Sequence, residues 1–183
     1  MKKLMIVLAI MLLMVGCSKE DATPDTNGNG STETNEPSDT SDDVEVVEGF
    51  SYVSNGVNIP MSVDAAPVVE ALGEPVDQFE AASCAFQGLD KIFYYNGFEL
   101  GTYPAGDKDM VSYVNFLDDS ITTEKGIYIG STAAEVIAAY GDEYTENSGS
   151  YVYHMGETKL TFIMEEDTVT SITYAAVVEG LNN

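Results

Sequence analysis

The first side chain to consider for catalysis is the single histidine, His154, because imidazole titrates near neutral pH. A hydrolytic triad would also need a nucleophile and an orienting acid in contact with it. The sequence has no nucleophile-elbow, HExxH or phosphate-loop pattern around which such a site is built. We therefore predict no catalytic residue and no enzymatic activity, with His154 as a hydrogen-bonded or surface residue of a strand.

Cys84 is a second residue with chemistry of its own. It lies in the small, apolar stretch Ala-Ala-Ser-Cys-Ala-Phe, which is typical of a buried structural thiol. The alternative is an intermolecular disulfide or a redox role. Nothing in the sequence indicates a cofactor.

Three acidic clusters could attract a divalent cation. None has the alternating ligands and the glycine of an EF-hand loop, and each falls where a strand must turn. We therefore predict solvated turn residues and no metal site, with cation binding as the alternative. The clusters are Asp107 with Asp109, Asp118-Asp119, and Glu165-Glu166-Asp167.

Four of the 11 tyrosines are candidate partner contacts. If the aliphatic residues of their strands face the core, alternation places Tyr103 and Tyr113 on the opposite face of the sheet. Tyr95 and Tyr153 are further candidates. Exposed aromatic rings are good anchors for a partner; alternatively, these rings cap core edges or pair across strands. In the C-terminal half the same alternation exposes Lys159, Thr161 and Ile163.

The first 17 residues resemble the signal peptide of a bacterial lipoprotein. Two lysines precede an apolar run from Leu4 to Val15, which is shorter than the roughly 20 residues of a spanning helix. The run ends Met14-Val15-Gly16-Cys17, similar to a lipobox with Met14 in place of the usual leucine. The resemblance implies that Cys17 carries a diacylglycerol thioether and anchors the chain at the extracytoplasmic face of the cell membrane. The alternative is an ordinary secretory signal with an incidental cysteine.

Residues 18–43 are rich in Ser, Thr, Asn, Gly and acids, with almost no apolar side chain. Such a segment cannot bury enough surface to offset its ordering entropy, so we expect a disordered acidic tether. Tethers of this kind are characteristic of the lipoproteins that the lipobox resembles, particularly in Gram-positive bacteria. The net charge of −24 would repel nucleic acid and excludes it as a partner.

The clearest local pattern spans residues 126–141. Thr132 and Glu135 have the spacing of a capping box, and Gly141 suits the left-handed position that ends a helix. A looser copy of this pattern spans residues 56–73, with a second helix at Asp64–Leu72.

The two copies predict an α+β domain over residues 44–183, formed by two tandem units at about 56–117 and 126–178. Each unit would be a helix followed by three antiparallel strands, and the units would share one antiparallel sheet with both helices on one face. Asn96-Gly97 is the strongest hairpin signal in the sequence.

Residues 126–132, with Glu135-Val136 and Tyr140-Gly141, are similar to the repeat signature of proteins like the β-lactamase inhibitor protein. The small outer-membrane-assembly lipoproteins share a related helix-plus-hairpin unit. The resemblance implies a tandem-repeat module with one open sheet face that holds other proteins. It does not imply lactamase inhibition, and no inhibitory residue is transferred.

These features predict a lipid-anchored, extracytoplasmic binding module that contacts an envelope or exported protein through its exposed sheet face. The first alternative is a cell-envelope lipoprotein that binds a small ligand or divalent cation in a pocket between the units. A third hypothesis is an envelope hydrolase, which the missing catalytic constellation disfavours.

The lipobox resemblance makes a direct prediction about Cys17. Protein extracted from the membrane should have the mass of a chain that begins at Cys17 and carries a diacylglycerol thioether. Intact-mass spectrometry measures this, and an unmodified Cys17 or a product found only in the soluble fraction would contradict it.

Overall fold

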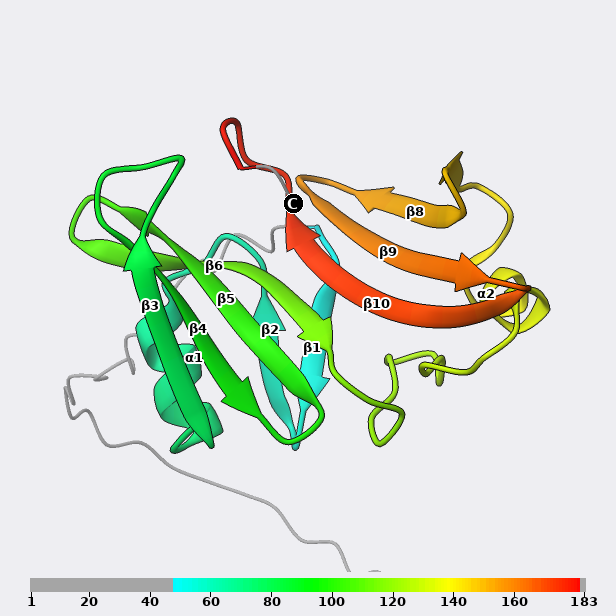
Figure 1. Cartoon of the computed structure of the whole chain (residues 1–183), viewed down its shortest axis with the longest axis horizontal. Coiled ribbons are helices and arrows are strands. Elements are labelled where there is room, and N and C mark those ends of the chain that lie inside the picture. Colours follow the sequence, from blue (N-terminus) through cyan, green and yellow to red (C-terminus); the bar gives the residue numbers. More distant parts are fainter. Residues whose placement is uncertain (1–47, 182–183) are drawn as a thin grey trace, which may run out of the picture. The chain divides into compact units, whose positions relative to one another are not determined.

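The computed structural model describes residues 48–181 (Figure 1). The predicted signal peptide, Cys17 and the predicted tether at residues 18–43 all lie outside these residues. The helices are α1 (Ala65–Leu72) and α2 (Ala133–Tyr140). The strands are β1 (Ser51–Ser54), β2 (Val57–Pro60), β3 (Asp77–Ala82), β4 (Leu89–Tyr95), β5 (Phe98–Ala105), β6 (Lys108–Phe116), β7 (Thr145–Asn147), β8 (Ser150–Met155), β9 (Thr158–Glu165) and β10 (Thr168–Ala176).

Eight of these strands form one antiparallel sheet, in the order β3-β4-β5-β6-β10-β9-β8-β7. Neighbours in the sheet are also neighbours in the sequence, except at the centre, where β6 pairs with β10. The strands β1 and β2 form a separate hairpin. Figure 1 shows this hairpin and α1 behind β4, β5 and β6, on one face of the sheet.

The predicted α+β class, with two tandem helix-plus-three-strand units, is wrong: the structure is mostly β, with one large sheet and only two short helices in residues 48–181. The additional strands explain the error. All residues of β3 and β7, the two edge strands, are exposed. A strand that is solvated on both faces has no apolar alternation, so the sequence pattern does not reveal it.

The core lies between the sheet and the elements that cover it. A row of facing residues crosses the sheet from Leu100 through Val114 and Tyr174 to Leu160, and all four are at most 2% exposed. Tyr52 of β1 covers the centre of this face: its ring centroid lies 5.9 Å from that of Tyr174. The same ring is 5.3 Å from Phe98 and 5.0 Å from Phe116.

Local capping chemistry places both helices as predicted. Thr132 and Glu135 form a reciprocal capping box at the start of α2, and Gly141 ends that helix at φ 89°. Asp64 caps α1 by accepting a hydrogen bond of 3.1 Å from the Ala66 N–H. Asn96-Gly97 forms the predicted turn, between β4 and β5.

Neither helix of the described residues could cross a bilayer, since both are far shorter than the membrane is thick.

The register predicts opposite outcomes for two nearby positions of β9. Leu160 is fully buried, whereas Ile163 faces the other side and is 44% exposed. Leu160→Ala should lower the free energy of unfolding by about 2–5 kcal/mol, because it leaves a cavity in the core. Ile163→Ala should change it by less than about 1 kcal/mol. Urea denaturation measures both, and equal losses would contradict the register.

Candidate binding site

The side of the large sheet that faces away from the helices is called the open face here. Two rows of facing residues define it, and their side chains are mostly polar or aromatic. The first row is Asp77, Tyr94, Glu99, Asn115, Thr173, Thr161, Val152 and Thr145; the second is Phe79, Ile92, Gly101, Tyr113, Ala175, Lys159 and His154. The predicted alternation in the C-terminal half is confirmed, since Lys159, Thr161 and Ile163 point to this side.

Tyr113 lies in the middle of the open face, on the side that alternation predicted. Its ring covers Gly101 of the neighbouring strand so closely that a Cβ at that position would collide with it. Burial and the nearby Glu99 raise the pKa of the Tyr113 phenol far above its usual value of 10.0. The Tyr113 hydroxyl already donates a hydrogen bond to the Glu99 side chain, so these two residues are held together on the open face.

The structure does not group the other three predicted tyrosines with Tyr113. Tyr103 is only 7% exposed, because Phe86 of the loop after β3 packs over it at 5.4 Å. Tyr153 is 4% exposed on the core side, and its hydroxyl donates to the Gly141 carbonyl at 2.8 Å. The prediction that these rings are exposed is therefore wrong.

Tyr95 also lies on the core side of the sheet, stacked on Phe98 at 5.0 Å. Its hydroxyl is buried and has no hydrogen-bond partner among the described residues. Burial raises the pKa of this phenol. Tyr95 thus supports the edge of the core, which was the alternative to partner binding.

A cleft lies on the other side of the sheet, between α1 and the β5–β6 hairpin, and is called the α1 cleft here. Its volume is about 490 Å³, within the usual range for ligand sites. Apolar side chains and charged side chains line it together. The lining residues are Asp64, Ala65, Ala66, Val69, Glu70, Phe93, Asp107, Lys108 and Asp109.

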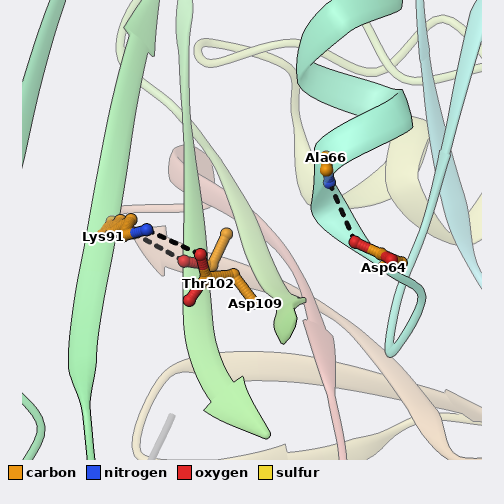
Figure 2. A network of polar contacts seen from close by, with 5 residues as sticks. All are labelled: Asp64, Ala66, Lys91, Thr102 and Asp109. Carbon is orange, nitrogen blue, oxygen red and sulfur yellow. Dashed lines mark hydrogen bonds and ion pairs between the residues drawn. The ribbon is translucent and has the colours of Figure 1, made fainter. Parts of the chain in front are cut away.

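Two ion pairs hold the charged side of the α1 cleft. Lys91 Nζ lies 2.7 Å from Asp109 Oδ2, and Lys108 Nζ lies 3.0 Å from Asp64 Oδ2. Figure 2 shows the Lys91 side chain reaching Asp109, and Asp64 at the first turn of α1. Hydrogen bonds from Lys108 and then from the Ala66 N–H lower the pKa of Asp64. Both lysines are thus neutralised, and the remaining carboxylates make the cleft acidic.

Sequence reasoning missed these ion pairs, because each joins strands or helices that are distant in sequence. Asp64 forms an isolated antiparallel backbone bridge with Met110, near the start of β6. This bridge brings its carboxylate next to Lys108, the first residue of that strand. The one signal in the sequence was the small number of basic residues: the chain has 31 acidic residues but only seven lysines and no arginine. A lysine in such a chain has many possible partners, and only the fold selects one.

The remaining candidate residues, His154, Cys84 and the acidic clusters, do not form a common site. His154 is exposed on the open face, consistent with a surface role. The buried environment predicted for Cys84 is wrong, because the thiol is exposed in the loop after β3. Within residues 48–181 no group of three or more His, Cys, Asp or Glu side chains could hold a metal ion.

The electrostatics of Asp64 predict an acid-dependent contribution to stability. Because its folded pKa lies below 3.8, the carboxylate stabilises the fold above that pH, and the effect is lost as pH falls through the folded pKa. Asp64→Asn keeps a capping oxygen and removes the charge. Its urea midpoint should lie below that of the unsubstituted protein at pH 6, and the two should converge at low pH. A difference that is constant with pH would contradict the ion pair with Lys108.

Comparisons with known proteins add little to this geometry. No protein-family model and no curated protein matches the sequence. Among solved structures, the chain is similar to a DUF4309 family protein (YjgB) from Bacillus subtilis subsp. subtilis str. 168. The two are 18% identical with a TM-score of 0.39, over 62% of this chain and 78% of the YjgB chain. A similarity at this level carries no conclusion about function, and the lipobox and inhibitor-protein resemblances stay predictions.

Proposed function

We propose that the protein is a lipid-anchored, extracytoplasmic binding module without enzymatic activity, which holds an envelope or exported protein on its open face. Cys17 would supply the anchor, and residues 18–43 would supply the tether. The acidic net charge of −24 argues against nucleic acid as the partner.

The observation that carries this proposal is the width of the open face. Its first row runs without interruption over all eight strands of the sheet, from Asp77 on β3 to Thr145 on β7. Both helices and the β1–β2 hairpin pack on the opposite side, where Tyr52, Val68 and Val136 belong to one core.

The composition of the open face suits a protein partner. Tyr94 and Tyr113 supply rigid rings with polar tips, which are favoured at interfaces. Around the central pair of strands, Thr173 donates to the Asn115 side-chain oxygen at 2.9 Å, so hydroxyl and amide groups are already oriented there. A partner can therefore meet aromatic area and hydrogen-bonding groups on one continuous surface.

The α1 cleft supports a second candidate function, the binding of a small molecule. Its volume of about 490 Å³ and its mixture of apolar lining and carboxylates suit a compact ligand with a cationic group. The cleft lies beside α1, so it differs from the pocket between units that the sequence suggested.

One experiment separates the two functions. A photo-crosslinking amino acid at Thr161, on the open face, should trap a protein in cells, whereas the same group at the exposed Ala138 of α2 should not. Ile163→Arg should reduce the trapped product at least tenfold, because a bulky cation would block the face. Ala66→Arg, which fills the α1 cleft, is the matched control and should leave the product unchanged.

Other outcomes contradict the open-face proposal. Equal trapping from Thr161 and Ala138 would show that contact is non-specific. Loss of the product in Ala66→Arg but not in Ile163→Arg would also contradict it, because the α1 cleft lies on the other side of the sheet from Thr161.

A further inference from the structure

The outer edge of β3 is a free strand edge. Among the described residues β3 pairs only with β4, and all six of its residues are exposed. It contains no lysine or proline, two of the residues that often protect such an edge, and its charged residues, Asp77 and Glu80, are both acidic. Its backbone can therefore accept another strand.

The hydrogen-bond pattern shows which backbone groups face outward. The Ser83 N–H donates to the Gly88 carbonyl at 3.0 Å, and the β3–β4 register continues from that pair. Bonded and non-bonded pairs alternate in an antiparallel ladder, so Phe79 and Ala81 bond inward to β4. The N–H and C=O groups of the even-numbered residues consequently point away from the sheet. These residues are Gln78, Glu80 and Ala82.

One of these outward donors is already used. Asp77 Oδ1 accepts a hydrogen bond of 2.9 Å from the Gln78 N–H. The N–H groups of Glu80 and Ala82 have no such partner among the described residues, and they lie two positions apart on the same edge. A strand that pairs opposite Glu80 could bind both.

Each side of this edge offers a place for the side chains of an added strand. On the open face, Phe79 is 57% exposed and adjoins Ile92. On the helix side, a hollow of about 280 Å³ is lined by Gln78, Glu80 and Phe93, together with Lys91 and Phe79. Alternate side chains of an added strand would cover Phe79 and enter the hollow.

Charge decides what can occupy the edge. A second copy of β3 that pairs opposite Glu80 would place its own Glu80 against this carboxylate, in a chain whose net charge is −24. The chain's own residues 18–43 are acidic as well. Both would be repelled, whereas an extended segment with lysine or arginine would be attracted.

We propose that β3 binds an extended, basic segment of another protein as a ninth strand of the sheet. The basic side chains of the segment lie beside Glu80 on the helix side, and its apolar side chains cover Phe79 on the open face. Main-chain hydrogen bonds to Glu80 and Ala82 give affinity, as in other strand-addition complexes. Phe79 belongs both to this edge site and to the open face, but the backbone groups of Glu80 and Ala82 belong to the edge alone, so binding at the edge can fail while contact around Thr161 and Ile163 persists.

The test uses an acetylated and amidated octapeptide of alternating lysine and valine with the isotopically labelled full-length chain. NMR measures the solvent-exchange rate of each backbone amide. At a peptide concentration about ten times its Kd, exchange at Glu80 and Ala82 should slow about tenfold. Exchange at Phe79 and Ala81 should barely change, because their amides are already bonded to β4. Protection elsewhere, or none at Glu80 and Ala82, would overturn the proposal.

Two substitutions at one position separate the backbone contribution from the charge. Glu80→Pro removes the outward N–H while keeping the β3–β4 ladder, since proline is tolerated on the open side of an edge strand. It should weaken peptide binding at least tenfold, with Phe79 and Ala81 still protected as evidence that β3 is intact. Glu80→Gln keeps the N–H and should weaken binding less, while making it less sensitive to salt. Unchanged binding in Glu80→Pro would overturn the proposal.

Two controls test the choice of occupant. A peptide in which glutamate replaces lysine should bind at least tenfold more weakly; equal binding would overturn the requirement for a basic segment. Analytical ultracentrifugation of the unsubstituted chain without peptide should show a monomer. The decisive contrary result is a dimer that disappears in Glu80→Pro. Such a dimer would assign the edge to a second copy instead.

Discussion

Between β6 and β10 the chain joins two strands that are far apart in sequence through three facing residue pairs. On the open face, Thr173 donates to Asn115, 58 residues away, at 2.9 Å. On the core side, the Tyr52 ring packs across Phe98 and Tyr174 and so covers the same junction. Without this pairing the sheet would divide into two four-stranded sheets, and no surface would extend from β3 to β7.

The two surfaces of the sheet differ because other elements of the chain cover only one of them. The β1–β2 hairpin, α1 and α2 all cover the core side, where Leu100, Val114 and Leu160 are fully buried. The opposite side keeps its side chains available, and β3 keeps its outer backbone groups available at one end. Both proposed binding modes, on the face and on the edge, follow from one sheet that is covered on one side only.

Local signals predicted the short-range features correctly, because the interactions that form them span only a few residues. The capping box at Thr132, the stop at Gly141 and the turn at Asn96-Gly97 are examples. The fold class was not predicted, because β3 and β7 have no buried side to reveal them. Of the candidate site, alternation placed Tyr113 on the correct face, whereas the covering of Tyr103 by Phe86 was not visible in the sequence.

The sequence by itself determined where helices begin and end and where hairpins turn, since caps and left-handed turn residues act within a few positions of the chain. It also determined the acidic character of the protein. Only the tertiary structure decided which tyrosines are buried, which aspartates Lys91 and Lys108 contact, and that β3 lies at an edge of the sheet. Those outcomes depend on segments distant in sequence that meet only when β6 pairs with β10.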